Sequence, residues 1–230
     1  MKTPAKVQKT SRLAVLTGAI LSTGMALAVS AILFFAWIAE EVFEGESTAF
    51  DNTVRKFIHK FAANWLTAVM QFFSFLGSTA FLSAATILLL LLFLFKRQSR
   101  SAVLLAIVMI GAIILNYTLK INFGRVRPEP FFHTALPDSF SFPSGHALFS
   151  ACFYGITAWL LLSTVAGRYL KVTISVAAGL IILFVGVSRI YLGVHYPTDV
   201  IAGYVAAFVW LSSVIWANGN VAARRPSPPK

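Results

Sequence analysis

Three short fragments of this sequence carry side chains that could do chemistry on a phosphate group. They read KINFGRVRP (120–128), PSGH (143–146) and SRIYLGVHYPTD (188–199). Together they hold lysine, arginine, histidine and aspartate in a chain of which only 12% is charged. Such charges are costly near a bilayer unless an anion or a reaction requires them. The fragments therefore predict a site that binds and processes a phosphate.

Three cations in the fragments, Lys120, Arg127 and Arg189, are suited to bind phosphoryl oxygens. Arginine binds two oxygens as a planar fork, and lysine supplies a compact charge. The alternative is that each side chain extends to a lipid headgroup at the membrane interface. Arg125 belongs to no such motif, and we assign it to the headgroup role.

The second fragment reads as the start of a helix. Ser144 is a natural N-cap, and Gly145 allows a ligand to approach the backbone closely. His146 would then lie beside a bound anion, where it could donate a proton to a leaving oxygen. The alternative is an ordinary helix cap followed by an incidental histidine.

The third fragment pairs an imidazole with a carboxylate. His195 precedes a helix, and Asp199 falls four residues later in its first turn. A carboxylate there can accept the proton of one ring nitrogen, which leaves the other nitrogen free to attack. The alternative is an interfacial histidine with a capping aspartate. His59 and His133 have no comparable setting and receive no role.

Six long apolar stretches must position these fragments. Hydrophobic residues make up 58% of the 230 residues, and a helix needs about 20 apolar residues to cross the hydrocarbon core. We therefore predict an all-α, six-transmembrane helix bundle in one domain at 13–217, flanked by a basic tail (1–12) and a second tail (218–230). The uncharged stretches are 13–39, 65–95, 101–119, 147–167, 172–188 (continuing past Arg189 to Val194) and 200–223.

The distribution of charge predicts the orientation of these helices. If the N-terminus lies inside, 12 of the 19 lysines and arginines fall on inner segments, and all eight acidic residues fall outside. This pattern fits the positive-inside rule. The net charge of +11 therefore reflects membrane topology, and we predict no nucleic-acid partner. Both termini are expected to be cytoplasmic, with all three fragments at the outer ends of helices.

Three further segments carry specific expectations. Residues 50–64 alternate phenylalanines with Arg55, Lys56 and Lys60 at helical spacing, which predicts an amphipathic helix on the outer surface. Residues 65–95 are too long for one straight span, and Gly77-Ser78 predicts a break before a spanning helix at about 78–95. The first apolar run resembles a signal peptide but continues to Ala39, which favours an uncut helix.

The three fragments match, without departures, the pattern K-x6-RP, PSGH and SR-x5-H-x3-D. The chain thereby resembles the type-2 phosphatidic acid phosphatase superfamily, also called the lipid phosphate phosphatases, over roughly residues 101–215. Six helices and an outward-facing site are similar to bacterial members such as phosphatidylglycerophosphate and undecaprenyl diphosphate phosphatases. The resemblance implies a two-step hydrolysis that needs no metal and no cofactor.

The resemblance also implies a role for each residue. His195 attacks phosphorus and forms a phosphohistidine, Asp199 orients His195, and His146 protonates the leaving oxygen and then activates water. The phosphoryl oxygens are bound by Lys120, Arg127, Ser144, Gly145 and Arg189. Vanadium haloperoxidases share these fragments but are soluble, which disfavours that class.

The expected substrate is a lipid phosphate at the outer leaflet of the cell (inner or plasma) membrane, with the site facing the periplasm or the cell exterior. Undecaprenyl diphosphate, phosphatidylglycerophosphate, phosphatidic acid and lipid A phosphate are candidates. The main alternative is a transporter or flippase for an anionic lipid or phosphate, which six helices would permit. A second alternative is a binding protein without activity. No obligate protein partner is predicted.

Overall fold

The computed structural model describes the backbone of residues 4–132 and 137–223 and the side chains of residues 24–132 and 137–219. These residues form eight α-helices and no β-strand, which confirms the all-α fold. The helices are α1 (Pro4–Glu44), α2 (Thr48–His59), α3 (Asn64–Leu76), α4 (Thr79–Phe95), α5 (Ser99–Phe123), α6 (Gly145–Leu162), α7 (Arg168–Tyr191) and α8 (Pro197–Ala223).

The bundle has five or six candidate spans, against the six that the apolar stretches predict. Five helices, α1, α5, α6, α7 and α8, are each long and apolar enough to cross a bilayer, and the bent pair α3–α4 makes a sixth if its two helices count as one span. The two helices of this pair meet at an angle of 46°, at the predicted break. Ser78 caps α4 by accepting a hydrogen bond from the Phe81 amide at 3.2 Å. A Cβ on Gly77 would lie 2.3 Å from Val185, so only glycine permits this close packing against α7.

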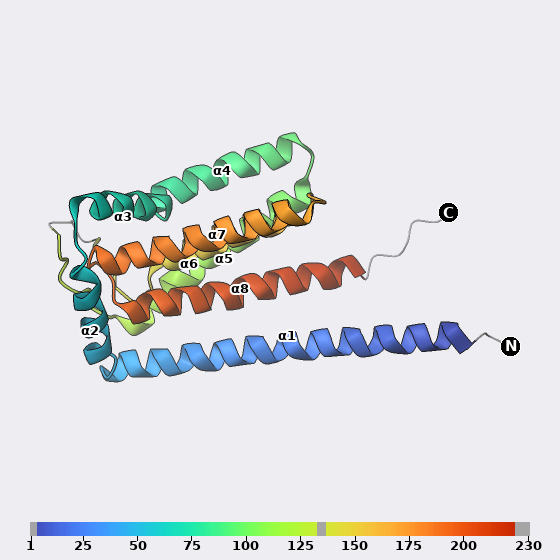
Figure 1. Ribbon diagram of the computed structural model, residues 1–230, viewed down its shortest axis with the longest axis horizontal. Coiled ribbons are helices and arrows are strands. Elements are labelled where there is room, and N and C mark those ends of the chain that lie inside the picture. The colour runs from blue at the N-terminus through green and yellow to red at the C-terminus, as the bar shows by residue number, and fades with distance from the viewer. Residues whose placement is uncertain (1–3, 133–136, 224–230) are drawn as a thin grey trace.

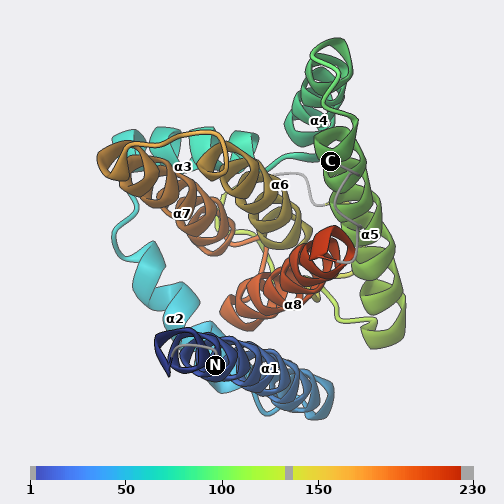
Figure 2. The ribbon, with the colours of Figure 1, turned by 90° about the vertical axis from the view of Figure 1, so that its right-hand side faces the viewer.

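The core lies where α4, α5, α6 and α8 meet. Leu105, Val108, Leu148, Cys152 and Ile156 are fully buried there. Figure 2, which looks along the bundle, shows α8 between α1 and α6. A second cluster fixes α1 against this core, because Ile38, Ala39 and Val42 pack on Phe142 and Ala202. The opposite face of α5, including Ile110, Ile113 and Ile114, stays exposed, as expected for a surface that contacts lipid.

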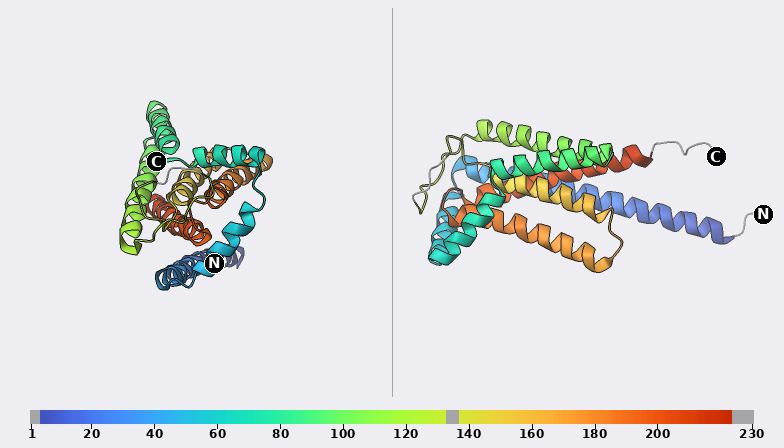
Figure 3. Two further views of the ribbon diagram at one scale, coloured as in Figure 1. Left: turned by 90° about the vertical axis from the view of Figure 1, so that its left-hand side faces the viewer. Right: turned by 90° about the horizontal axis from the view of Figure 1, so that it is seen from above.

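The helix ends that carry the three fragments lie at one end of the bundle. Figure 1 shows α5 and α7 ending, and α6 and α8 beginning, on the left, where α2 also lies. The view from above in Figure 3 places the loop between α5 and α6 at this same end. α1 begins and α8 ends at the opposite end. Residues 70 positions apart in sequence are therefore brought together by the alternation of the helices alone.

α2 turns polar side chains, not its phenylalanines, toward the rest of the protein. It ends at His59, and its Asp51 and Arg55 are buried at the junction with α7 and α8. Phe50, Phe57 and Phe61 are exposed instead. Of the three cations in segment 50–64, Arg55 therefore faces the protein, whereas Lys56 and Lys60 are exposed.

The segments predicted as tails are largely helical. α1 already begins at Pro4 and α8 continues to Ala223, so helix extends into both the 1–12 and the 218–230 segments. The predicted tail segments therefore include residues that continue the first and last helices. Residues 1–3 and 224–230 lie outside the described part of the chain, as does His133.

Candidate active site

The turn between α7 and α8 brings His195 and Asp199 together. Gly193 adopts a positive φ of 76°, and a Cβ there would lie 2.6 Å from the backbone nitrogen of Phe131, so the turn requires glycine. His195 is 2% exposed and Asp199 is fully buried. The His195 Nδ1 atom lies 3.2 Å from Asp199 Oδ2. The two predicted residues, His195 and Asp199, are therefore in contact.

A second contact fixes the tautomer of His195. Its Nε2 atom lies 3.0 Å from Nη1 of Arg127. Arginine can only donate hydrogen bonds, so Nε2 is unprotonated and accepts from Arg127 with its lone pair, and Nδ1 carries the proton that Asp199 accepts. Burial lowers the pKa of His195 to about 4, although Asp199 opposes this shift. The ring is therefore neutral at neutral pH, with Nε2 available as a nucleophile.

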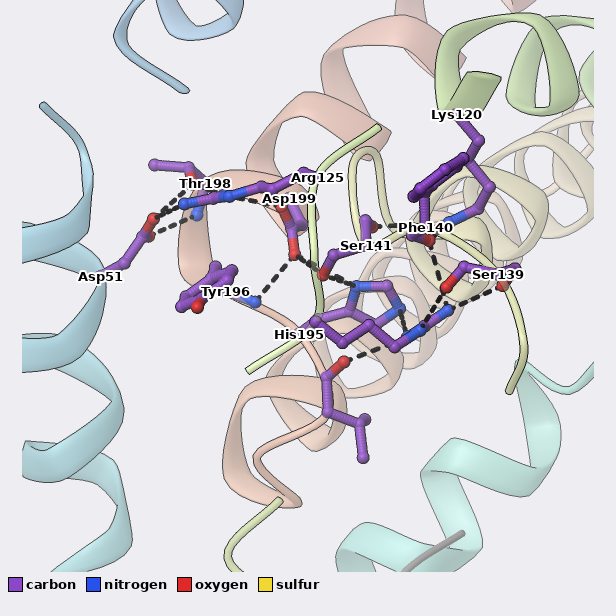
Figure 4. A network of polar contacts seen from close by, with 12 residues as sticks. Asp51, Lys120, Arg125, Ser139, Phe140, Ser141, His195, Tyr196, Thr198 and Asp199 are labelled. Carbon is purple, nitrogen blue, oxygen red and sulfur yellow. Dashed lines mark hydrogen bonds and ion pairs between the residues drawn. The ribbon is translucent and has the colours of Figure 1, made fainter. Parts of the chain in front are cut away.

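Asp199 accepts hydrogen bonds on both of its oxygens, as Figure 4 shows. Oδ2 lies 2.5 Å from Oγ of Ser141 and 2.9 Å from the amide nitrogen of Tyr196, in addition to its contact with His195. Oδ1 accepts from Nη1 of Arg125 at 2.7 Å. A fully buried carboxylate is stable only when it is paired and hydrogen-bonded in this way. Asp199 is thus held ionised and in a fixed orientation.

The cations of the first fragment approach the site from α5 and the loop after it. Gly124, in the left-handed conformation at φ 57°, ends α5 one turn after Lys120. Lys120 Nζ donates to the carbonyl of Phe140. Arg127 donates from Nε to the carbonyl of Ser139 at 2.7 Å and from Nη2 to its hydroxyl at 3.0 Å. Segment 139–141 therefore holds both cations, and Arg127 also contacts His195.

Arg189 reaches the site from the last turn of α7. It is 7% exposed and donates from Nη1 to the hydroxyl of Ser74 on α3. Its Nε atom is buried without a hydrogen-bond partner among the described residues. A buried cation with an unused donor has the chemistry of an anion-binding group.

The second fragment begins α6, as predicted, but Ser144 does not act as a cap. Its backbone takes the N-cap position, yet its Oγ is fully buried and forms no hydrogen bond within the described chain. Its amide instead donates to the backbone carbonyl of Asp199 at 2.9 Å, which joins the second fragment to the third. A Cβ on Gly145 would lie 3.3 Å from the ring of Phe149 and 3.4 Å from Asn116 Oδ1, so the backbone is closely surrounded.

His146 lies in the first turn of α6, close to the bend between α3 and α4. Its Cδ2 would be 3.3 Å from a Cβ on Gly77. It lies within electrostatic range of Arg189, Arg127, Lys120 and His195. The structure thus gathers all eight predicted residues at one end of the bundle, with direct contacts between Arg127, His195 and Asp199.

Four contributing residues escape a reading of the sequence: Asp51, Ser74, Arg125 and Ser141. The assignment of Arg125 to lipid headgroups is wrong, because its side chain is 11% exposed and contacts the carboxylates of Asp51 and Asp199 at 2.7 Å each. Burial alone would lower the pKa of Arg125, but the two carboxylates outweigh it and raise that pKa. Of these four residues, only Arg125 could have been suspected from the sequence, because it lies two residues before Arg127.

No group of three or more His, Cys, Asp or Glu side chains in residues 24–132 and 137–219 has a geometry suited to a metal ion. The acidic side chains at the site are Asp51 and Asp199, and both are engaged by Arg125. The groups that could act on a substrate here are therefore two imidazoles, the oriented carboxylate of Asp199 and several cations.

Known proteins share both the sequence pattern and the fold. A family model described as the PAP2 superfamily matches residues 101–222. Phosphatidylglycerophosphatase B of Bacillus subtilis (strain 168) is 33% identical over 180 residues, which cover 76% of this chain and 87% of that protein. The undecaprenyl-diphosphatase of Sulfolobus acidocaldarius is 33% identical over 127 residues, which cover 53% of this chain and 57% of that protein.

A solved structure extends the similarity to most of the chain. The crystal structure of a transmembrane PAP2-type phosphatidylglycerolphosphate phosphatase from Bacillus subtilis superimposes with a TM-score of 0.77 and 31% identity. The superposition covers 86% of this chain and 98% of that chain. The region matched by the family model, residues 101–222, includes all three fragments and the ends of α5, α6, α7 and α8 that carry them. The chain therefore belongs to the PAP2 superfamily and is a multi-pass membrane lipid phosphatase.

Proposed function

We propose that this protein hydrolyses a phosphate monoester or diphosphate of a membrane lipid through a phosphohistidine intermediate. The observation that carries the proposal is the fixed tautomer of His195, whose Nε2 lone pair lies beside Arg127 while its Nδ1 faces Asp199. A nucleophile needs a free lone pair, and a nearby cation attracts the phosphoryl group to be attacked.

In the first step, the Nε2 lone pair of His195 forms a bond to phosphorus while the bond from phosphorus to the lipid oxygen breaks. The imidazole becomes positively charged, and Asp199 stabilises that charge through Nδ1–H. His146, in its protonated form, donates a proton to the departing oxygen. Lys120, Arg127 and Arg189 bind the non-bridging oxygens, on which the transition state carries negative charge.

In the second step, water attacks phosphorus and the bond between phosphorus and Nε2 breaks. His146, now neutral, accepts a proton from the water, which restores both histidines and releases inorganic phosphate. Ser144 and the amide of Gly145 lie at the start of α6, where backbone N–H groups favour an anion. The buried, unpaired Oγ of Ser144 supports this assignment, because a phosphoryl oxygen would supply its missing partner.

An apolar cavity of about 280 Å³ supports a lipid as the substrate. It lies between α1, α5 and α8, and Leu119, one of its lining residues, directly precedes Lys120. We propose that an acyl or prenyl chain lies in this cavity while its phosphate reaches His195. The lining residues are Ile32, Phe35, Leu115, Leu119, Ala206, Val209, Trp210 and Ser213.

Phosphate release from a panel of lipid monophosphates and diphosphates tests the reaction. The purified protein in detergent should release phosphate in the presence of EDTA from phosphatidylglycerophosphate, phosphatidic acid or undecaprenyl diphosphate. His195→Ala is the matched inactive control. A labelled substrate should leave an acid-labile, base-stable phosphoryl group on the protein. No release from any lipid on the panel would favour the transport alternative.

We further propose that the site faces the periplasm or cell exterior, with both termini in the cytoplasm. The support is the excess of cations on the opposite segments, including Lys96, Arg97 and Arg168. A single cysteine introduced at Asp138, in a Cys152→Ser background, should react with a membrane-impermeant thiol reagent added to intact cells. Reaction only after the cells are opened would reverse this orientation.

A further inference from the structure

Arg125 lies between two fully buried carboxylates that come from distant parts of the chain. Its Nη1 lies 2.7 Å from Asp199 Oδ1, and its Nη2 lies 2.7 Å from Asp51 Oδ2. The ring of Tyr196 packs against the guanidinium, with the Arg125 Cζ atom 4.0 Å from the ring centroid. Figure 4 shows Arg125 extending between the two acids. The guanidinium of Arg125 is therefore held on two edges by the carboxylates and on one face by the ring of Tyr196.

The contact with Arg125 determines how the Asp199 carboxylate is turned. Three donors converge on Oδ2, whereas Oδ1 has Arg125 as its hydrogen-bond donor within the described residues. Without that donor, Oδ1 would be a buried charged oxygen without a partner, which is strongly unfavourable. The carboxylate would then rotate or take up a proton. Either change moves Oδ2 out of its alignment with Nδ1 of His195.

Asp51 in turn fixes Arg125 to the first turn of α8. Its Oδ1 accepts from the amide of Thr198 at 3.0 Å, and its Oδ2 accepts from the Thr198 hydroxyl at 2.7 Å. The Thr198 hydroxyl also accepts from Nη1 of Arg125 at 2.8 Å. Since Thr198 precedes Asp199, α2 holds the backbone of Asp199 through Thr198 and its side chain through Arg125.

The combined charge of Asp51, Arg125 and Asp199 favours the reaction as well as the fold. Two carboxylates and one guanidinium leave a net negative charge on the Nδ1 side of His195, opposite to Arg127 on the Nε2 side, and the ring is neutral before it attacks. That negative charge opposes the positive charge that the imidazole acquires when Nε2 bonds to phosphorus. A preorganised charge of this kind stabilises the transition state more than the bound substrate.

We propose that Arg125 and Asp51 are positioning residues for catalysis: Asp51 fixes Arg125, Arg125 fixes Asp199, and Asp199 thereby aligns His195 for attack on the phosphorus of a lipid phosphate. This inference rests on the proposed phosphohistidine reaction. Neither residue contacts the groups assigned to the phosphate, so both act on the rate of the chemical step and leave substrate binding unchanged.

Steady-state kinetics in detergent on the best substrate of the lipid panel tests the proposal. Arg125→Gln should lower kcat by about 100-fold, because a hydrogen bond to a buried charged group is lost. Arg125→Lys keeps the positive charge but loses the planar fork, so its kcat should lie between those of the wild type and Arg125→Gln. Asp51→Asn turns a donor toward Arg125 and should lower kcat by about 10-fold. KM should stay within about threefold, since a pure kcat effect marks loss of a transition-state interaction.

Lys56→Gln is the matched control, since it removes a cation from the exposed side of the same helix and should behave as wild type. Inhibition by vanadate separates positioning from a merely structural role. Vanadate imitates the transition state when bound to His195, so its inhibition constant should rise in parallel with the fall in kcat. The inhibition constant for inorganic phosphate should stay constant. A general loss of folded protein would move neither constant.

Two results would overturn the proposal. One is a wild-type kcat in both Arg125→Gln and Asp51→Asn, and the other is a raised KM at unchanged kcat. If Arg125→Gln does not fold, Arg125→Lys and Asp51→Asn carry the test. Failure of the proposed function is distinguishable, because the wild type would then release no phosphate. In that event, vanadate should still raise the unfolding temperature of the wild type and of Lys56→Gln but not of Arg125→Gln, and an equal rise in all three would refute the positioning role.

Discussion

Replacing Asp199 by asparagine should nearly abolish turnover without unfolding the protein. The carboxylate accepts on both oxygens, from Arg125 on Oδ1 and from His195, Ser141 and the Tyr196 amide on Oδ2. An amide has one oxygen and one NH2 group, so either orientation places a donor against a donor. If the NH2 group faces His195, the ring must reverse its tautomer and Nε2 loses its lone pair. If it faces Arg125, the guanidinium loses its acceptor.

The magnitude follows from these contacts. Both orientations remove the negative charge that stabilises the positive imidazole, and both disrupt one further charge-assisted hydrogen bond. At about 1.5–3 kcal/mol for each interaction, the barrier rises by roughly 3–6 kcal/mol. Since about 1.4 kcal/mol corresponds to a factor of ten, kcat should fall by about 10²- to 10⁴-fold. Folding should be affected less, because Arg125 keeps Asp51 as its partner.

The assay is phosphate release from a lipid phosphate in detergent, with kcat and KM measured separately and the unfolding temperature measured on the same preparation. KM should change by less than about threefold, because Asp199 does not contact the phosphate. A kcat within tenfold of the wild type, in a variant that unfolds at the wild-type temperature, would refute the role given to the Asp199 carboxylate.

Three other perturbations test separate parts of the site. Arg127→Lys should lower kcat/KM by about 100-fold, since lysine cannot replace a planar fork; wild-type kinetics would show that Arg127 does not bind phosphoryl oxygens bidentately. An NMR titration of the His195 ring should have its midpoint near pH 4, because burial lowers the pKa to about 4, and a midpoint at the usual 6.5 would contradict the described burial. As the unfolded chain takes up that proton first, the folded protein should lose stability as the pH falls from about 6.5 toward 4. Val209→Phe should reduce kcat/KM for long-chain lipid phosphates by about 10-fold and leave a short-chain analogue unaffected, while equal effects on both would exclude the cavity as the site of the chain.

The spans could be predicted because apolar length is a direct consequence of bilayer thickness. The break between α3 and α4 was predictable for a similar reason, since a run from 65 to 95 exceeds one span and Gly77-Ser78 interrupts it. The convergence of Lys120, His146 and His195 then followed from the alternation of helices. These features depend on local composition and topology, which a sequence displays directly.

The orientation of α2 was not predictable by the same reasoning. In a soluble protein the apolar side of an amphipathic helix packs on the core, and the charged side contacts water. Beside a bilayer the phenylalanines can face lipid, and polar residues can face a polar protein interior instead. Asp51 and Arg55 are buried for this reason. Choosing between the two arrangements requires knowledge of the buried partners, Thr198 and Arg125 for the acid.

The contributions of Arg125 and Ser144 also depend on tertiary contacts. A lone arginine near an interface has the same appearance in sequence whether it contacts headgroups or a buried acid. Ser144 occupies a capping position, and only its buried, unpaired hydroxyl shows that it does not cap α6. Motif spacing predicts the groups that we propose contact the phosphate, whereas the residues that hold those groups carry no spacing signal.

The contact of Asp51 with Arg125 has a consequence for the modularity of the enzyme. The family match covers residues 101–222, but Asp51 lies 50 positions before it and Ser74 27 positions before it. The segment that carries the signature therefore does not contain every side chain that holds Asp199 and Arg189 in place. A chimera that joins α5–α8 of this chain to the first four helices of a relative would need an acid and a hydroxyl at these two positions. The first hundred residues, which carry no signature of their own, therefore still supply side chains that hold the site together.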